Sequence, residues 1–301
     1  MFRRLLVPLD GARLSEAVLP MAAFLAQRSG ARVTLLHVVE QRAPSKVHGD
    51  RHLTTAEEAG QYLAEVARRH FPASATVDWH VHRREIADVA HSLADHADEL
   101  ESDLVVMLAH GHGDLRRWLS GTLAQQVLRQ APTPILFLRP DAKGQITVPF
   151  HRILVPLDGQ AHHESGLPVA ATLARLASAA VQILMVVPTF TTLGGVHAAS
   201  GQLLPSATRE ILDLAEREGA EYLQRHLERL KQEGIVVSAA VARGEPASVI
   251  PAIAESFHAD LVVLGTHGSA GIEAFWAASV GQKLFDRIPV SFLFAPAAAE
   301  K

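Results

Sequence analysis

An internal duplication constrains this 301-residue chain more than any other feature. The segment Leu6–Gly11 returns as Leu154–Gly159, and both read Leu-Val-Pro-Leu-Asp-Gly. A second segment, Asp103–Val106, returns in the same order as Asp260–Val263, and both read Asp-Leu-Val-Val. A repeat that spans about half of a chain is too long for a solenoid, so it indicates two copies of one domain.

The length is sufficient for two domains that each bury a hydrophobic core. We place them at residues 1–140 and 150–301, because Pro, Gly and charged residues interrupt both helix and strand periodicity in Arg139–Gln145. The hydrophobic fraction of 48% and the charged fraction of 20% are typical of a globular protein.

The composition also excludes several classes of function. The chain has no cysteine, which excludes disulfides, thiolate metal sites and a cysteine nucleophile. Its formal net charge of −4 argues against nucleic acid and anionic membranes as partners. No apolar segment approaches the roughly 20 residues that cross a bilayer, and no signal-peptide hydrophobic region follows Met1. We therefore expect a cytoplasmic protein.

Each half alternates short apolar segments with longer amphipathic ones, which predicts alternating strands and helices. In the first half, strands are expected at Leu5–Leu9, Arg32–Val39, Thr76–His82, Leu104–Ala109 and Ile135–Leu138, and helices at about 13–29, 54–70, 85–100 and 121–130. In the second half, strands are expected at Ile153–Leu157, Val181–Val187, Val236–Ala242, Leu261–Gly265 and Ser291–Ala295, and helices at about 162–178, 206–233, 245–257 and 277–286. Right-handed crossovers then give two doubly wound α/β domains.

In such a domain the ligand site lies at the carboxyl ends of the strands, where the strand order reverses. Asp10 and Asp158 end the first strand of each half, and a glycine-containing loop follows the fourth. Glycines allow a ligand to approach the backbone, and the helix after the loop offers N–H groups to a phosphate. The aspartates could accept hydrogen bonds from a ribose hydroxyl or an exocyclic amine. The alternative is that they only end strands and cap turns.

At these residues the chain resembles the universal stress protein family in its tandem form. Nucleotide-binding members carry the pattern Gly-x-x-Gly, nine residues, Gly-Ser/Thr. The second copy has Gly265, Gly268, Ala278 and Ser279 at these positions, and the first has Leu108, Gly111, Gly121 and Thr122. The resemblance implies a five-stranded parallel sheet of order 3-2-1-4-5, flanked by helices, in each domain. It also implies that the base and ribose lie near the Pro-x-Asp turn and the second strand, and the phosphates on the glycine-rich loop.

From this resemblance we expect ATP, with or without Mg²⁺, chiefly in the second domain. The residues expected to bind it are Pro156, Leu157, Asp158, Val186, Leu264, Gly265, Gly268, Ala278, Ser279 and Val280. A weaker second site is expected at Asp10, Val38, Gly111, Gly121 and Thr122. It is expected to be weaker because the side chain of Leu108 would obstruct a ribose at the family's first glycine position.

ATP is expected to act as a regulatory ligand of a protein that is not an enzyme. The chain lacks the phosphate-binding motif Gly-x-x-x-x-Gly-Lys-Ser/Thr, and no acidic residue can be paired with a catalytic lysine to anchor Mg²⁺. His80 and His82 share one strand face, but the sequence offers no third metal ligand beside them. Two alternatives stay open: a structural or interaction protein with decayed nucleotide sites, and a slow ATPase.

The duplication also predicts how the halves assemble. A fused pair replaces the two-fold contact of a homodimer, so we expect the two domains to pack as a pseudo-dimer. The apolar last strands, Ile135–Leu138 and Phe292–Phe294, are the expected contact edges, because they would otherwise be exposed. A homodimer of tandem chains also stays open, and the sequence does not identify a protein partner.

Overall fold

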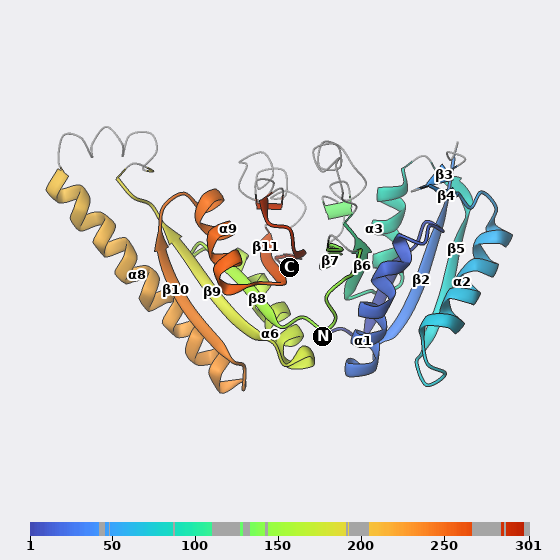
Figure 1. Cartoon of the computed structure of the whole chain (residues 1–301), viewed down its shortest axis with the longest axis horizontal. Coiled ribbons are helices and arrows are strands. Elements are labelled where there is room, and N and C mark those ends of the chain that lie inside the picture. Colours follow the sequence, from blue (N-terminus) through green and yellow to red (C-terminus); the bar gives the residue numbers. More distant parts are fainter. Residues whose placement is uncertain are drawn as a thin grey trace.

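The computed structural model describes residues 1–41, 46–47, 49–86, 88–109, 127–128, 133–141, 144–190, 192, 205–266, 284–285 and 287–297. The two halves of the chain form two α/β domains that lie side by side (Figure 1). One ten-stranded sheet runs through both of them.

The first domain supplies five parallel strands. These are β1 (Arg4–Pro8), β2 (Arg32–Glu40), β5 (Val77–Ile86), β6 (Leu104–Leu108) and β7 (Ile135–Leu138). Its helices are the 3₁₀ helix η1 (Ser15–Val18), α1 (Leu19–Ser29), α2 (Ala56–His70) and α3 (Val89–Glu99). A short hairpin, β3 (Lys46–Val47) and β4 (Asp50–Arg51), follows β2. The strand order β5-β2-β1-β6-β7 confirms the predicted order 3-2-1-4-5.

The second domain repeats this arrangement. Its strands are β8 (Arg152–Leu157), β9 (Ala180–Val187), β10 (Val237–Arg243), β11 (Leu261–Thr266) and β12 (Ser291–Pro296). Its helices are η2 (Ala161–Ser165), α6 (Gly166–Ala177), α8 (Pro205–Gln232) and α9 (Pro246–Phe257). The order β10-β9-β8-β11-β12 again follows the pattern 3-2-1-4-5.

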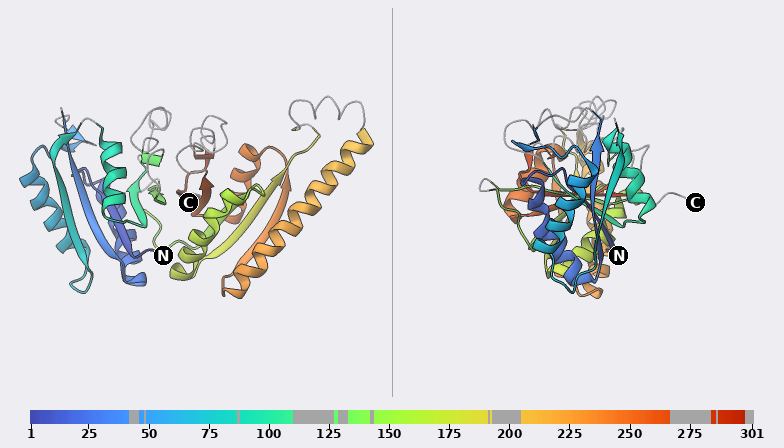
Figure 2. Two further views of the ribbon diagram at one scale, coloured as in Figure 1. Left: turned by 180° about the vertical axis from the view of Figure 1, so that it is seen from behind. Right: turned by 90° about the vertical axis from the view of Figure 1, so that its right-hand side faces the viewer.

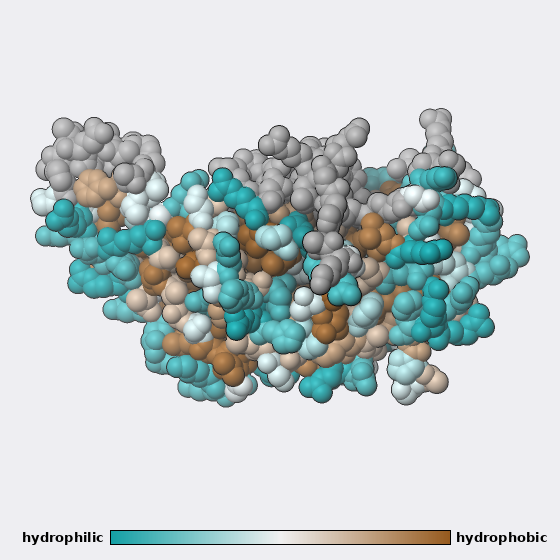
Figure 3. Space-filling view, viewed as in Figure 1, coloured by the Kyte–Doolittle hydropathy of each residue, from teal (hydrophilic) through white to brown (hydrophobic). Residues whose placement is uncertain are grey.

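Helices cover both faces of the sheet, as the edge-on view in Figure 2 shows. One hydrophobic core lies under α1, α2, α6 and α8, and the other lies under α3 and α9. Each core contains buried residues from both domains. Figure 3 shows hydrophilic residues over α8 and α2 at the two ends of the molecule. The sheet is therefore buried on both faces, as a parallel sheet requires.

The domains join through their last strands, which confirms the predicted pseudo-dimer contact. Strands β7 and β12 pair antiparallel, with Leu136 opposite Leu293 and Phe137 opposite Phe292. All four side chains are fully buried. The ring centroids of Phe137 and Phe294 lie 5.9 Å apart in an edge-to-face arrangement. Because each strand completes the sheet of the other domain, neither leaves an exposed apolar edge.

Two arginines link the domains outside this strand pair. Arg139 donates to the carbonyl oxygens of Ile288 at 2.6 Å and of Phe285 at 3.0 Å. Its guanidinium carbon lies 4.4 Å from the centre of the Phe285 ring. On the other face, Arg28 at the end of α1 donates to the Leu176 carbonyl oxygen at 3.0 Å. Arg139, the first residue of the predicted linker, is thus part of the contact between the domains.

The structure corrects several predicted boundaries. The helices expected at 13–29 and 162–178 each begin as a separate 3₁₀ turn. Strand β5 continues to Ile86, so α3 begins at Val89 and not near residue 85. The hairpin of β3 and β4 was not predicted. The helices expected at 121–130 and 277–286 lie largely outside the described residues.

Among the described residues, no helix is both long enough and apolar enough to cross a membrane. This finding agrees with the short apolar segments of the sequence.

Candidate functional site

The two repeated Asp-Gly pairs form the same turn at the end of the first strand of each domain. The Oδ1 atom of Asp10 accepts a hydrogen bond from the backbone N–H of Ala12 at 2.9 Å, and Asp158 accepts one from Gln160 at 3.0 Å. Gly11 and Gly159 have φ angles of +90° and +83°, a left-handed conformation that favours glycine. The aspartates therefore do cap turns, and each does so through Oδ1.

In the second domain the other carboxylate oxygen of Asp158 has a histidine as its partner. The Nδ1 atom of His163 in η2 lies 2.6 Å from the Oδ2 atom of Asp158. The Asp158 side chain is 51% exposed and that of His163 is 16% exposed. Burial opposes ionisation of Asp158, but the hydrogen bonds from His163 and Gln160 outweigh it and hold the pKa of this carboxyl below its ordinary value. The result is an ionised, oriented and half-exposed acceptor.

The next residue of η2 ties this turn to the long helix α8. Tyr222 donates from its hydroxyl to the Oε1 atom of Glu164 at 3.0 Å, and the Nε2 atom of His226 lies 3.3 Å from the same oxygen. Burial, together with the nearby Glu164 carboxylate, raises the pKa of Tyr222. Burial lowers the pKa of His226, although Glu164 opposes that shift. The neutral Tyr222 hydroxyl thus acts as a donor that holds η2 against α8.

Two glycines bring η2 close to strand β11. A Cβ atom placed on Gly265 would lie 2.0 Å from the carbonyl oxygen of His163 and 2.8 Å from its Cα atom. A Cβ atom placed on Gly166 would lie 3.1 Å from the backbone nitrogen of Gly265. The family resemblance implies that a ribose approaches the backbone at Gly265. In the structure, the chain's own backbone at His163 occupies that space.

The first domain fills the equivalent region with larger side chains. Leu108 stands at the position of Gly265 and Val18 at the position of Gly166, and both are buried. Ser15 takes the place of His163, and its hydroxyl donates to the Ala12 carbonyl oxygen at 2.8 Å. The 3₁₀ turn of the first domain is therefore held by a different set of contacts.

A cavity of about 80 Å³ lies beside Asp10, at the carboxyl ends of β1, β2 and β6. Val38, His37 and His52 are among the residues that line it. The Nδ1 atom of His37 bonds the Leu9 carbonyl oxygen at 2.8 Å, and burial lowers the pKa of His37 despite that bond. Neither the Nε2 atom of His37 nor the Nδ1 atom of His52 has a hydrogen-bond partner among the described residues. Asp10 and Val38, the two described residues of the predicted weaker site, thus line a small, mainly apolar cavity.

Residues that follow β2 cover this cavity and the turn beside it. The backbone N–H of Arg13 donates to Asp50 at 2.9 Å, which fixes the hairpin against the Asp10 turn. A Cβ atom on Gly11 would lie 2.7 Å from the Leu53 side chain, so that side chain packs directly on the turn. His52 is 3% exposed. Asp50 and Leu53 therefore cover part of the first-domain turn, in which Asp10 and Gly11 stay partly exposed.

The structure brings part of the predicted second-domain site together. Pro156 and Leu157 end β8, Val186 lies near the end of β9, and Leu264 and Gly265 lie near the end of β11. Because these strands are parallel neighbours in the order β9-β8-β11, their ends meet at one edge beside Asp158. The other predicted residues lie outside the described residues: Gly268, Ala278, Ser279 and Val280, and in the first domain Gly111, Gly121 and Thr122.

Sequence reasoning missed His163. The signal was present, because the pair His162-His163 follows Asp158 closely whereas the first copy has Leu14-Ser15 at the same positions. Both histidines lie outside the Gly-x-x-Gly pattern, so that pattern gives no indication of a role for them.

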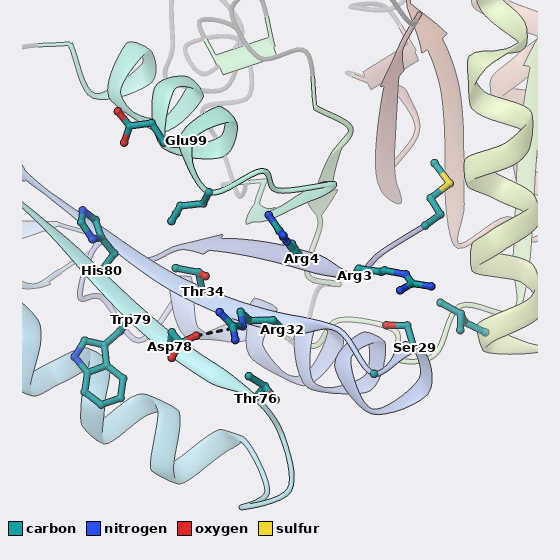
Figure 4. Close-up of a pocket in the computed structure, with 14 residues that line it drawn as sticks. Arg3, Arg4, Ser29, Arg32, Thr34, Thr76, Asp78, Trp79, His80 and Glu99 are labelled. Atoms are coloured by element: carbon teal, nitrogen blue, oxygen red, sulfur yellow. Dashed lines mark ion pairs between the residues drawn. The ribbon is translucent and has the colours of Figure 1, made fainter.

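A larger hollow, of about 1120 Å³, lies at the opposite, amino-terminal edge of the first-domain sheet (Figure 4). Arg3, Arg4 and Arg32 line it together with acidic side chains. The Nε atom of Arg32 lies 3.5 Å from the Oδ2 atom of Asp78, and both side chains are largely exposed. This hollow is far from the strand ends where doubly wound domains bind ligands, so its size does not make it the first candidate.

The histidine pair on β5 gains a third histidine in the structure. The Nδ1 atom of His82 lies 3.3 Å from the Nε2 atom of His96 on α3, and the rings of His80 and His96 have centroids 5.0 Å apart. Burial and the two neighbouring histidines lower the pKa of His80. Within the described parts of the chain, however, no group of three or more His, Cys, Asp or Glu residues is arranged to hold a metal ion.

Comparisons with known proteins match this architecture. The sequence profile of the universal stress protein family matches residues 1–139 and 149–296. Universal stress protein Sll1654 of Synechocystis is 29% identical over 136 residues, which cover 45% of this chain and 85% of that protein. Universal stress protein YxiE of Bacillus subtilis is 27% identical over 139 residues, which cover 45% of this chain and 91% of that protein. Each relative thus corresponds to about one domain.

A solved structure matches both domains at once. The crystal structure of a universal stress protein from Archaeoglobus fulgidus superimposes with a TM-score of 0.67 at 18% identity, covering 99% of this chain and 97% of that one. At this identity the match shows the fold. The profile match, which extends over both halves, shows the family. The chain belongs to the universal stress protein family, with two domains of that family in tandem.

Proposed function

We propose that this protein binds an adenine nucleotide in its second domain, as a regulatory ligand and not as the substrate of rapid turnover. The observation that carries the proposal is the Asp158 carboxylate, which is ionised, 51% exposed and fixed by His163 at the carboxyl end of β8. It stands where the strand order of the sheet reverses, the usual ligand site of doubly wound domains. Family membership supports the choice of a nucleotide.

Each part of the ligand has a candidate partner in this domain. Asp158 would accept a hydrogen bond from a ribose hydroxyl or from the exocyclic amine of the base. Val186 and Leu264 would supply apolar contacts to the base. The phosphates are assigned from the sequence to the loop of Gly268 and to the helix start at Ala278, Ser279 and Val280, because backbone N–H groups there suit an anion. ATP with or without Mg²⁺ is the ligand of first choice.

The first domain would bind nucleotide more weakly. Its cavity of about 80 Å³ is far below the roughly 300–1,000 Å³ of ordinary ligand pockets. Leu53 packs on the turn at Gly11, and Leu108 stays in the core, so a ligand would have to displace parts of the chain. The covered turn and the small cavity also favour, for that domain, the alternative of a structural module with a decayed site.

Analysis of the ligand carried by the purified protein tests the proposal. Denaturation followed by mass spectrometry should release an adenine nucleotide, at no more than one molecule per chain. If the protein releases none, equilibrium dialysis with ATP should still show saturable binding that the Asp158→Ala variant loses. A protein that carries no nucleotide and binds none in dialysis would support the decayed-site alternative. Release of ADP and phosphate over hours would instead support a slow ATPase.

A further inference from the structure

We propose that His163 is a positioning residue for the second-domain ligand site, and that Gly166 and Gly265 serve to hold it in place. His163 fixes the carboxylate of Asp158 in the orientation in which it receives the ligand. The inference rests on the proposed nucleotide function. The inference adds His163, which lies outside the Gly-x-x-Gly pattern, to the site. It also explains why the first position of that pattern, Gly265, has no side chain.

The geometry around Asp158 fixes its carboxylate plane. One oxygen, Oδ1, accepts from the backbone N–H of Gln160, and the other, Oδ2, accepts from Nδ1 of His163. A carboxylate has about four acceptor positions, so two such bonds leave positions free for ligand donors. With both oxygens held, the side chain cannot rotate away from the site. A ligand then meets an acceptor that is already oriented, which reduces the entropy lost on binding.

The position of His163 in turn depends on the two glycines. Its carbonyl oxygen occupies the space that a side chain on residue 265 would need, since the two atoms would be only 2.0 Å apart. A Cβ atom on Gly166 would meet the backbone nitrogen of Gly265 less severely, in a tight contact of 3.1 Å. Any side chain at position 265 would push η2 away from β11. The imidazole would move with the backbone, and the 2.6 Å bond to Asp158 would lengthen or break.

The duplication provides an internal comparison. The three residues that orient Asp158 in the second domain all differ in the first. Ser15 stands in place of His163, Val18 in place of Gly166 and Leu108 in place of Gly265. Ser15 directs its hydroxyl to the Ala12 carbonyl oxygen, so it does not take over the histidine's role. If the glycines serve the histidine, the three positions should differ together, and they do.

Other titratable groups lie near the Asp158–His163 pair. The ring of His162 has its centroid 4.3 Å from that of His163, and Glu164 is engaged by Tyr222 and His226 of α8. A substitution at His163 should leave the Glu164 contacts to α8 in place, because they involve a different side chain. The effect on Asp158 can therefore be separated from a general loosening of η2.

The test compares His163→Ser, which installs the first-domain residue, with His163→Asn, whose amide nitrogen can donate from nearly the same place as Nδ1. ATP affinity is measured by calorimetry, and the titration of the Asp158 carboxyl is followed by NMR. We expect the Ser variant to bind ATP about tenfold more weakly, because the Asp158 side chain must then be ordered when the ligand binds. Its Asp158 pKa should rise towards the ordinary value. The Asn variant should recover most of the affinity.

A second pair of variants tests the glycine contact. Gly265→Ala should weaken ATP binding to the same extent as His163→Ser, and the double variant should be no weaker than either single one, because both act through the same bond. Circular dichroism and thermal unfolding establish that each variant is folded. If Gly265→Ala does not fold, the comparison of His163→Ser with His163→Asn still tests the positioning role of His163.

The outcomes separate the two claims. Wild-type affinity in the Ser variant, or equal losses in the Ser and Asn variants, would overturn the positioning role while leaving the nucleotide function intact. If the wild-type protein binds no ATP, the proposed function fails, and the Asp158 titration still tests whether His163 holds this carboxylate. An unchanged Asp158 titration in the Ser variant would then overturn the inference as well.

Discussion

Phe137 of the first domain lies directly opposite Phe292 of the second, in an antiparallel strand pair that joins two otherwise parallel sheets. Both side chains are fully buried, and further aromatic rings, Phe285 and Phe294, pack around them. The contact resembles the inside of a domain more than a surface between two independent domains. The tandem chain therefore should behave as one folding unit.

Arg139 is expected to contribute measurably to this contact. It is partly buried and donates to two carbonyl oxygens of the other domain, so Arg139→Ala should lower the free energy of unfolding by about 1–3 kcal/mol. The matched control is Arg28→Ala, whose exposed bond to Leu176 should contribute less than about 0.5 kcal/mol. Urea denaturation of both variants provides the comparison. Equal decreases in the free energy of unfolding would show that Arg139 contributes no more to the domain contact than Arg28 does.

Separated domains should not be stable monomers. Residues 1–140 and 150–301, expressed alone, would each expose an apolar last strand, which favours edge-to-edge association. We expect each half to self-associate or precipitate, and the co-expressed halves to form a one-to-one complex. Light scattering after gel filtration measures this. Two soluble, monodisperse monomers with the stability of the full chain would contradict a shared interface.

Stability should fall in mild acid because of His37. Burial lowers the pKa of His37 in the folded protein, whereas the unfolded chain takes up a proton below about pH 6.5. The unfolded state then binds more protons, so stability decreases as the pH falls from 6.5 towards the lowered pKa. The largest slope from one group is about 1.4 kcal/mol per pH unit.

The second domain suggests the variant that tests this effect, because Met185 stands at the position equivalent to His37. His37→Met should flatten the decrease in stability between pH 6.5 and 5, as measured by chemical denaturation at several pH values. His91→Gln, at an exposed surface position, serves as the control and should leave the decrease unchanged. A decrease that is as steep in His37→Met as in the wild type would show that other histidines, such as His80 and His226, dominate.

Leu108→Gly should destabilise the first domain and not create a second nucleotide site. Leu108 is 3% exposed and belongs to the core, so its removal leaves a cavity and should cost at least about 3 kcal/mol. The turn at Asp10 would still be covered by Leu53 and His52. Unfolding experiments and ATP titration of the variant measure both effects. A second ATP site of comparable affinity would show that Leu53 and His52 do not obstruct binding at the Asp10 turn.

Much of the fold could be predicted from the sequence. Short apolar segments indicate strands that are buried on both faces of a sheet, and the amphipathic segments between them indicate the helices that cover it. The strand order came from the family resemblance, and the contact of the last strands followed from their apolar character. The extension of β5 to Ile86 could not be predicted, because it depends on pairing with Glu40 across an irregular register. The hairpin of β3 and β4 has too few residues to give a pattern.

The candidate site was predicted less well than the fold. Asp158 and Asp10 were found because the duplication repeats them. His163 was missed because its role depends on a contact across a turn. The neighbour of Gly265 could not be predicted either, because a missing side chain says nothing about what fills the space beside it. Only the three-dimensional structure identifies the backbone of His163 as that neighbour.

Calorimetric titration of the full-length protein with ATP tests the central claim most directly, using wild type, Asp158→Ala and Asp10→Ala. We predict one site per chain in the wild type. Asp158→Ala should weaken it by about 1.5–3 kcal/mol, the usual value for a hydrogen bond to a charged group, and Asp10→Ala should leave it unchanged. Two equivalent sites, a larger loss from Asp10→Ala than from Asp158→Ala, or no binding heat at any ATP concentration would contradict nucleotide binding centred on the second domain.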